Sequence, residues 1–219
     1  MLIVCAGTGT EVGKTWIGAT VLASLRKAGI QVAARKPVQS FDPATGEPTD
    51  ADVLAAATGE SPTAVCPPRR WLPFPMAPPM AAAALGQASF TLAELIAELD
   101  WPNPHPDVRW IEAVGGVRSP LAADGDTVDL CRALKPDLVV LVANAGLGVI
   151  NLVRLSVEAL RPWTVAVMLN HYCDDDPLHN RNRAWLRERD GLEILAHPEE
   201  LVRRVYPLAG SREANLGHA

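Results

Sequence analysis

A glycine-rich turn between an apolar segment and a helix-forming segment marks the amino-terminal end of this chain. Residues 2–7 are apolar, Gly9 and Gly13 follow, and Lys14 and Thr15 come next. Glycine tolerates the positive φ angles that turn successive backbone N–H groups inward, and a helix beginning there directs the positive end of its dipole at the same point. The pattern therefore predicts a loop that cradles the phosphates of a nucleotide, and we expect that nucleotide to be ATP.

Two side chains complete the predicted phosphate loop. Lys14 would neutralise the β- and γ-phosphates, and the hydroxyl of Thr15 would bind Mg²⁺, a cation that prefers oxygen ligands. The spacing is a variant of the common pattern, because five residues rather than four separate Gly7 from Gly13. A plain turn followed by a surface lysine is the alternative interpretation. The register of strand, loop and helix favours the phosphate loop.

Composition and charge predict one α/β domain without a membrane or nucleic-acid partner. The chain has 219 residues, 48% of them hydrophobic, so we expect a single domain over residues 1–210 and a flexible tail over residues 211–219. A net charge of −5 without a basic run argues against nucleic acid and anionic membranes. No apolar run reaches the roughly 20 residues that span a bilayer. The cysteines are scattered, which indicates reduced thiols and a cytoplasmic protein.

Short apolar runs alternate with helical patterns along the chain. Besides the first strand, strands are expected at residues 31–38, 108–113, 137–143, 163–169 and 192–196. Helices are expected at residues 16–28, 127–134, 149–160 and 179–189, and an Ala-rich helix at 80–85 follows a proline-rich irregular loop at 62–79. The alternation predicts a P-loop NTPase-like α/β fold, with a mainly parallel sheet covered by helices on both faces. Ligands bind such sheets at the carboxyl ends of the strands.

Lys36 and Ser40 follow the second predicted strand, at the same sheet edge as the phosphate loop. A lysine at that edge can neutralise charge that develops on a transferred phosphoryl group or on a bound oxyanion, most effectively where water is excluded. The alternative is a solvent-exposed lysine at the end of a strand. Pro37 fixes the backbone directly after Lys36, and the edge shared with Lys14 favours the functional interpretation.

Carboxylates at the same edge are candidate metal ligands. Asp50 and Asp52 open an alanine-rich helix, where an acidic residue also stabilises the first turn. Glu112 ends an apolar strand and is soon followed by Gly115 and Gly116, so we expect it to point into the crevice. Burying an unpaired carboxylate is costly, and a cation would compensate for it. The three adjacent acidic residues 174–176 are more typical of a solvated loop, and we assign them no role.

These motifs resemble the dethiobiotin synthetase family over most of the chain. Its members carry Gly-Thr-Asp-Thr-x-Val-Gly-Lys-Thr at the loop, and residues 7–15 match it, additional residue included, with Gly9 in place of Asp. Lys-Pro-Val-x-Ser matches residues 36–40, and an acidic residue before alanine matches Asp50. Pro-x-x-Pro matches residues 75–78, Glu-Gly-Ala-Gly-Gly corresponds to residues 112–116, and Gly-x-Leu-Gly-x-Ile-Asn is close to residues 145–151, which begin with Ala145.

The resemblance implies a homodimeric, ATP- and Mg²⁺-dependent ligase that converts 7,8-diaminopelargonate and CO₂ or bicarbonate to dethiobiotin. It implies Mg²⁺ ligands at Thr15, Asp50 and Glu112, and catalytic roles for Thr10, Lys14, Lys36 and Ser40. It implies ATP contacts from Gly9, Thr10, Glu11, Val12, Gly13, Lys14, Thr15, Trp16, Asn170, Ala196, His197 and Pro198. The carboxylate tail of the substrate would lie against the partner subunit, at Gly146, Leu147, Gly148, Val149, Ile150 and Asn151.

Three positions depart from the family pattern, and other functions stay open. Phe41 stands where the family has glycine, Ala113 and Val114 fill the middle of the acidic motif, and Ala196 replaces a glycine near the adenine. These side chains would narrow the substrate or base pocket. The alternatives are a related P-loop amidoligase, which would need a glutaminase partner, a catalytically silent ATP-binding paralogue, and an ATP-dependent switch of the partitioning type. Such switches usually carry another lysine early in the loop, and residues 8–10 have none.

Overall fold

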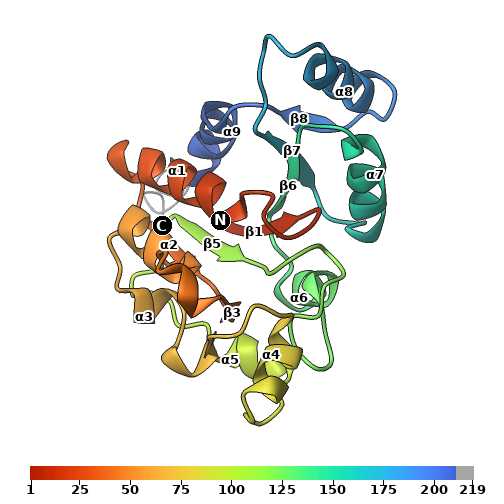
Figure 1. Ribbon diagram of the computed structural model, residues 1–219. Helices are drawn as coiled ribbons and strands as arrows, with labels where there is room; N and C mark the ends of the chain where they lie inside the picture. Colours follow the sequence, from red (N-terminus) through yellow and green to blue (C-terminus); the bar gives the residue numbers. More distant parts are fainter. Residues whose placement is uncertain (211–219) are drawn as a thin grey trace.

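A parallel β-sheet forms the centre of the molecule (Figure 1). The computed structural model describes residues 1–210, and within them six strands pair in the order β2-β5-β1-β6-β7-β8. Their bounds are β2 Val32–Arg35, β5 Val108–Glu112, β1 Leu2–Gly7, β6 Leu138–Asn144, β7 Val165–Asn170 and β8 Glu193–Leu195. All the pairings in this sheet are parallel. The predicted α/β fold with a parallel sheet is confirmed.

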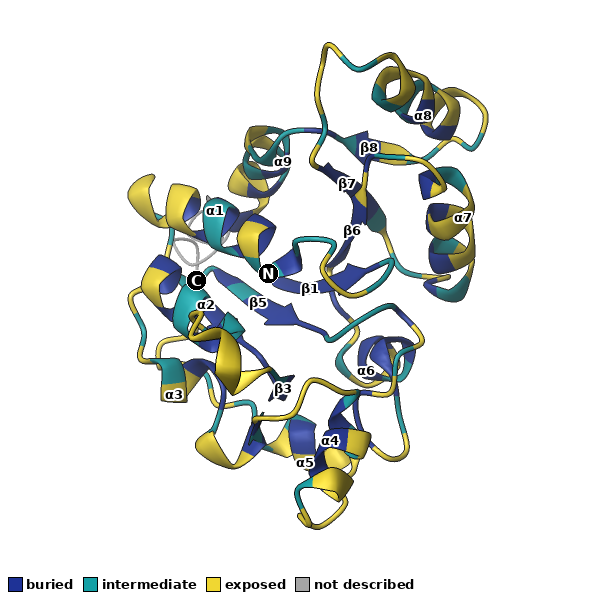
Figure 2. Cartoon of the chain, viewed as in Figure 1, coloured by how far each residue is buried: buried dark blue, intermediate teal, exposed yellow. Residues whose placement is uncertain are grey.

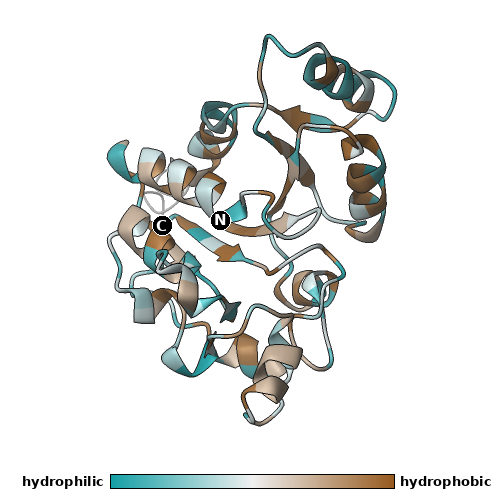
Figure 3. Ribbon diagram, viewed as in Figure 1, coloured by the Kyte–Doolittle hydropathy of each residue, from teal (hydrophilic) through white to brown (hydrophobic). Residues whose placement is uncertain are grey.

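Helices cover both faces of this sheet, and alternate strand residues divide between two cores. Ile3, Cys5 and Val140 pack with α1 (Lys14–Lys27), α2 (Asp50–Thr58) and α9 (Pro198–Gly210). Val4 and Leu141 pack on the other face, with α4 (Pro78–Ala84), α5 (Leu92–Ala97), α6 (Thr127–Leu134), α7 (Val149–Ala159) and α8 (Pro177–Glu188). Strands apolar on both faces, dark blue in Figure 2 and mostly brown in Figure 3, are what this double cover requires.

The second predicted strand was too long. β2 ends at Arg35, whereas the hydrophobic pattern placed its end at residue 38. Pro37 has no N–H group to donate to a neighbouring strand, and the N–H of Lys36 donates instead to the carbonyl of Val65 at 2.8 Å. The chain then resumes as β3 (Gln39–Ser40), which pairs in parallel with β4 (Trp71–Leu72) in a separate two-stranded sheet.

The proline-rich segment is more regular than the sequence suggested. It contains α3 (Pro62–Val65), a 3₁₀ turn at Pro68–Arg70 and β4, and α4 begins at Pro78 rather than at residue 80. Proline is well tolerated in the first turn of a helix, because its missing N–H would have no partner there. Counting prolines as helix breakers was therefore wrong at the starts of α3 and α4.

Other predicted bounds hold within a few residues, and two helices were missed. α6 occupies the predicted residues, while α1, α7, α8 and the later strands differ from prediction by one or two residues at an end. No helix was predicted at the residues that form α5 and α9. The predicted tail, residues 211–219, lies outside the described residues. Within residues 1–210, no helix is both long and apolar enough to cross a membrane.

Gly18 shows how closely α1 packs on the sheet. A Cβ atom added there would lie 3.0 Å from Nε1 of Trp110, a fully buried side chain, and 3.3 Å from Cδ2 of Leu54. We expect Gly18→Ala to lower the free energy of unfolding by about 1–2 kcal/mol, because overpacking outweighs the gain of about 1 kcal/mol that alanine gives in a helix. Urea denaturation measures this change. The control Ser24→Ala, at an exposed position of the same helix, should be neutral, and a stabilising Gly18→Ala would contradict the packing argument.

Candidate functional site

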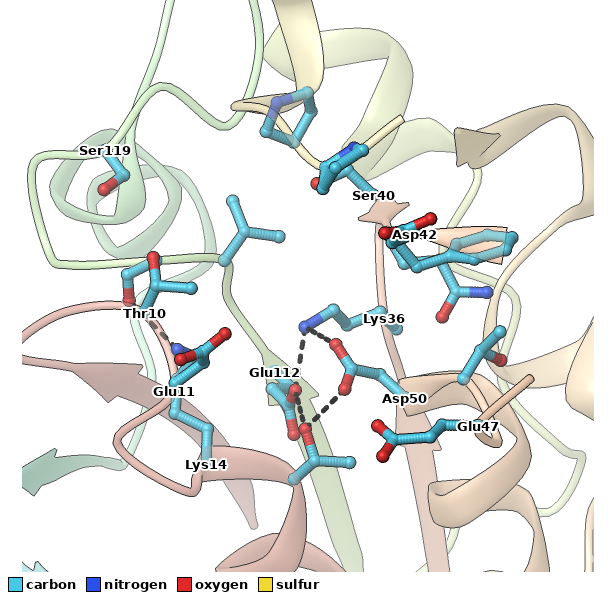
Figure 4. A pocket seen from close by; sticks show the side chains of 18 of the residues that line it. Thr10, Glu11, Lys14, Lys36, Ser40, Asp42, Glu47, Asp50, Glu112 and Ser119 are labelled. Atoms are coloured by element: carbon cyan, nitrogen blue, oxygen red, sulfur yellow. Dashed lines mark hydrogen bonds and ion pairs between the residues drawn. The ribbon is translucent and has the colours of Figure 1, made fainter. Parts of the chain in front are cut away.

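A pocket of about 770 Å³ opens at the carboxyl edge of β1, β2 and β5. Its walls come from the phosphate loop, the segment after β2, the first turn of α2, residues 75–78 and the turn after β5 (Figure 4). The residues lining it are Thr10, Glu11, Gly13, Lys14, Thr15, Trp16, Lys36, Gln39, Ser40, Phe41, Asp42, Thr45, Glu47, Pro48, Thr49, Asp50, Pro75, Met76, Ala77, Pro78, Glu112, Val114, Gly115 and Ser119. The fold thus brings these separate parts of the chain into one site.

The phosphate loop has the backbone that the glycine pattern predicted. Gly13 has φ 88° and directly precedes α1. Its α-carbon also faces Asn170, since a Cβ atom at position 13 would lie 2.0 Å from Nδ2 of Asn170. That Nδ2 donates to the carbonyl of Val12 at 3.0 Å. Glycine is therefore required here both for its conformation and for the close approach of the asparagine.

Lys14 lies buried at the start of α1, with backbone carbonyls as partners. Its Nζ donates to the carbonyl of Gly9 at 3.2 Å and to that of Gly115 at 3.1 Å. Burial lowers the pKa of Lys14, and the nearby charge of Lys36 lowers it further. A buried ammonium held by neutral carbonyls is well placed to exchange them for phosphate oxygens, whose negative charge binds it more strongly.

Lys36, Asp50, Glu112 and Thr15 form a compact cluster beside the loop. The Nζ of Lys36 lies 2.7 Å from Asp50 Oδ2 and 2.7 Å from Glu112 Oε1. The Oγ1 of Thr15 lies 2.7 Å from Asp50 Oδ1 and 2.8 Å from the same Glu112 oxygen. Lys36 and Glu112 are fully buried, while the Asp50 side chain is 39% exposed toward the pocket. Figure 4 shows the side chains of Lys36, Asp50 and Glu112 meeting in the pocket.

The two carboxyls of this cluster respond differently to burial. Burial raises the pKa of Glu112 above its ordinary value, although Lys36 opposes the shift. Burial acts in the same direction on Asp50, but the charge and the hydrogen bond of Lys36 outweigh it and bring the pKa of Asp50 below its ordinary value. The pKa of Lys36 is raised: burial alone would lower it, and the charges of Asp50 and Glu112 prevail. Lys36 therefore stays protonated at physiological pH.

Local sequence explains why Asp50, and not Asp52, belongs to this cluster. Thr49 is the N-cap of α2, and its hydroxyl accepts from the N–H of Asp52 while the Asp52 carboxylate accepts from the N–H of Thr49. This capping box uses Asp52 to stabilise the helix end. Asp50 lies in the first turn with its side chain turned to the pocket. Stabilisation of the helix start therefore describes Asp52, while the position of Asp50 fits the predicted metal ligand.

The carboxylates and the hydroxyl fit a divalent cation. Glu112 Oε2 is buried without a hydrogen-bond partner among the described residues, and the single proton of Thr15 cannot satisfy both carboxylates at once. Within residues 1–210 no three His, Cys, Asp or Glu side chains gather into a metal site. An ion held by Thr15, Asp50 and Glu112 would therefore keep positions for phosphate oxygens and water, which is typical of Mg²⁺.

Several predicted ATP contacts lie away from this pocket. The pocket lining does not include Asn170, Ala196, His197 or Pro198. Asn170 braces the phosphate loop through Val12, and Nε2 of His197 lies 3.3 Å from Asp174 at the surface. Their predicted role in adenine binding stays a prediction.

The predicted tail-binding segment also lies outside the pocket of its own chain. Residues 146–148 lie between β6 and α7, residues 149–151 form the first turn of α7, and Leu147 is 91% exposed. Gly148 is the N-cap of α7 with φ 90° and provides no side chain to cap the helix. The N–H of Val149 donates to the carbonyl of Gly146 at 3.4 Å. Among the described residues nothing accepts from the N–H groups of Ile150 and Asn151, which are therefore available to an anion.

Sequence reasoning missed part of the pocket wall. Asp42 and Glu47 lie between β3 and α2, and Ser119 lies in the turn after β5. Nothing in the local sequence distinguished them from ordinary loop residues, because the pairing of β5 between β1 and β2 is what brings that turn to the pocket. Phe41 does line the pocket, and its ring packs edge-on against Trp71 with centroids 6.5 Å apart.

Comparison with known proteins gives a consistent set of relatives. Residues 2–201 match a family described as an AAA domain. An ATP-dependent dethiobiotin synthetase BioD from Anaeromyxobacter sp. (strain Fw109-5) is 37% identical over 90% of this chain and 91% of its own length. The protein of the same name from Haloferax mediterranei is 35% identical over 91% of this chain and 87% of its own. The protein of the same name from Rhodococcus jostii (strain RHA1) is 38% identical over 73% of this chain and 67% of its own length.

Removing the cation of Lys36 should destabilise the fold. Lys36→Met leaves Glu112 and Asp50 without their partner, and breaking a buried ion pair costs about 3 kcal/mol. The loss in the free energy of unfolding should be largest near neutral pH. It should shrink as acid protonates Asp50, because the lowered pKa of Asp50 gives stability that is present above the ordinary carboxyl pKa and is lost as the pH falls. Urea denaturation at several pH values measures it.

The double variant Lys36→Met/Glu112→Gln is the control for this prediction. It replaces the unpaired buried carboxylate by a neutral amide and should recover part of the lost stability. A single variant as stable as the parent at neutral pH would show that the cluster does not stabilise the fold.

Proposed function

The chain belongs to the ATP-dependent dethiobiotin synthetase family, and from this premise we propose that it carboxylates 7,8-diaminopelargonate and closes the ureido ring of dethiobiotin, with hydrolysis of ATP to ADP and phosphate. The observation that carries the proposal is the juxtaposition of the phosphate loop with the Lys36, Asp50 and Glu112 cluster in one pocket. A nucleotide held by the loop would present its terminal phosphate to a fixed cation. That is the requirement for a ligase that activates a carboxylate by phosphorylation.

The electrostatics of Lys36 indicate its role. Two carboxylates raise its pKa, so it would remain a cation throughout the reaction and would not serve as a general base. Its Nζ would hold an oxygen of the carbamate that forms from the diamine and CO₂. The hydroxyls of Thr10 and Ser40, on opposite walls of the hollow (Figure 4), would orient the same group.

Lys14 would act on the nucleotide. In the proposed reaction the carbamate oxygen attacks the γ-phosphate, ADP leaves, and the second amine then displaces phosphate to close the ring. Lys14 would leave its two carbonyl partners and neutralise charge on the β- and γ-phosphates. Thr15, Asp50 and Glu112 would hold Mg²⁺, which supplies further charge neutralisation at the phosphate oxygens when it is bound.

The proposal includes a homodimer located in the cytoplasm. Residues 146–151 of one subunit would receive the carboxylate tail of the substrate bound in the other, at the open N-terminus of α7. Each complete site would then contain parts of two chains. Within residues 1–210 the cysteines are free thiols, which fits a reducing compartment.

Incubation with ATP, Mg²⁺, bicarbonate and 7,8-diaminopelargonate tests the function. Dethiobiotin should form and be identified by its mass, with one ADP released for each ring closed. ATP hydrolysis without dethiobiotin would support a different reaction of the same fold. ATP binding without turnover would support a silent paralogue.

Lys14→Ala should reduce dethiobiotin formation at least a hundredfold while the protein stays folded. The lost ammonium interacts more strongly with the charge of the transition state than with the ground state, and removing one such group costs about 3 kcal/mol. Steady-state rates measure the loss, and circular dichroism verifies the fold. Undiminished turnover in the folded variant would exclude the phosphate-loop assignment.

Mixing two inactive variants tests the shared site. Lys14→Ala disables the phosphate loop, and Asn151→Glu places a repelling carboxylate in the first turn of α7, at an exposed position where acidic residues suit a helix. Each homodimer should be inactive. Co-expressed chains that pair at random should recover about a quarter of the parental activity, because half of the dimers are mixed and each has one intact site of two. Demonstrated heterodimers without activity would favour a pocket contained in one chain.

A further inference from the structure

The turn after β5 is packed directly against the phosphate loop. A Cβ atom on Gly7 would lie 3.0 Å from the carbonyl oxygen of Gly115, and one on Gly116 would lie 3.3 Å from the carbonyl oxygen of Thr8. Gly115 itself has φ 56°, and its carbonyl accepts from Lys14. The turn and the loop therefore form one continuous wall of the pocket.

Ser119 closes this turn with two hydrogen bonds. Its N–H donates to the carbonyl of Gly116 at 3.0 Å, and its Oγ accepts from the N–H of Gly116 at 2.9 Å. A Cβ atom on Gly115 would lie 2.5 Å from this Oγ and 3.7 Å from Oγ1 of Thr10. The hydroxyls of Ser119 and Thr10 thus flank the same α-carbon, and both residues line the pocket, on the wall opposite Ser40 (Figure 4).

The hydroxyl proton of Ser119 has no hydrogen-bond acceptor among the described residues. A serine hydroxyl has one proton to donate and two lone pairs to accept. The bond from Gly116 uses a lone pair and fixes the position of the oxygen. Within residues 1–210 nothing accepts the hydroxyl proton, and Ser119 is a half-buried residue that lines the pocket.

We propose that Ser119 is a substrate-binding residue whose hydroxyl donates a hydrogen bond to an oxyanion of the bound substrates. The pocket offers two such groups if the proposed function is right, on which this inference rests: the carbamate of the diamine and the γ-phosphate of ATP. Both are acceptors, and a hydrogen bond from a held hydroxyl to a charged oxygen is among the stronger kinds. The bond from Gly116 holds the oxygen in place, so little side-chain entropy remains to be lost on binding.

Substitutions that separate donation from turn closure test the proposal. Ser119→Thr keeps both functions of the hydroxyl. Ser119→Ala removes both. Ser119→Asp supplies an acceptor for the N–H of Gly116 but has no proton to donate at neutral pH, and its charge repels an oxyanion. If the hydroxyl donates, kcat/KM for dethiobiotin formation should stay near the parental value for threonine, fall roughly tenfold for alanine and fall further for aspartate. If Ser119 only closes the turn and no oxyanion lies beside it, Ser119→Asp should equal or exceed Ser119→Ala.

Two further measurements identify the oxyanion. A contact with the γ-phosphate predicts that Ser119→Ala weakens the binding of ATP with Mg²⁺ but leaves that of ADP with Mg²⁺ unchanged, as measured by calorimetry. A contact with the carbamate predicts unchanged nucleotide affinities and a raised KM for the diamine. Ser61→Ala is the matched control, because it removes a comparable hydrogen bond that the N–H of Ala64 donates to the Oγ of Ser61 outside the pocket. It should leave all these values unchanged.

The outcomes separate this inference from the proposed function. Two results would overturn the inference alone, provided that the parent protein makes dethiobiotin. One is a kcat/KM of Ser119→Ala equal to the parental value. The other is a kcat/KM of Ser119→Asp no lower than that of Ser119→Ala. A parent protein that makes no dethiobiotin would overturn the function, and with it the carbamate contact. The difference between ATP and ADP affinity in the Ser119 variants would then still decide the phosphate contact.

Discussion

The ammonium group of Lys36, buried between Asp50 and Glu112, is the interaction on which the rest of the pocket depends. Lys36 follows β2, Asp50 begins α2 and Glu112 ends β5, so one cation joins the start of α2 to the ends of two paired strands. Thr15 connects the same carboxylates to the start of α1. A buried charge must be compensated, and the compensation here fixes the geometry of the site as well as its charge.

The partners of the two pocket lysines, Lys36 and Lys14, differ in charge. Lys36 is held by carboxylates, while Lys14, a short distance away, is held by carbonyl oxygens alone. The first is a permanent part of the wall. The second is a cation whose partners are neutral and can be replaced by phosphate. Burial by itself lowers the pKa of both lysines, but Asp50 and Glu112 reverse this effect on Lys36 and raise its pKa, whereas the pKa of Lys14 stays lowered.

The sequence predicted the site better than its surroundings, for physical reasons. Glycines at positive φ, a lysine before Pro37 and a carboxylate ending an apolar strand each have few structural explanations, so Gly13, Lys36 and Glu112 could be identified locally. The strand end at Arg35 was missed because the prediction extended the strand to Val38, although Pro37 interrupts pairing. Ser119 and Glu47 were missed because only the strand order brings their loops to the pocket, and that order is a property of the whole sheet.

The carbonyl of Gly115 links the phosphate loop to the turn after β5 through Lys14. Lys14 is shared between the phosphate loop and the turn after β5, so its position depends on both. Thermodynamic linkage is reciprocal: a ligand that draws Gly115 away from Lys14 changes the affinity for nucleotide, and nucleotide changes the affinity for that ligand by the same factor. Two substrates bound on either side of this lysine would therefore not bind independently, and each would report on the presence of the other.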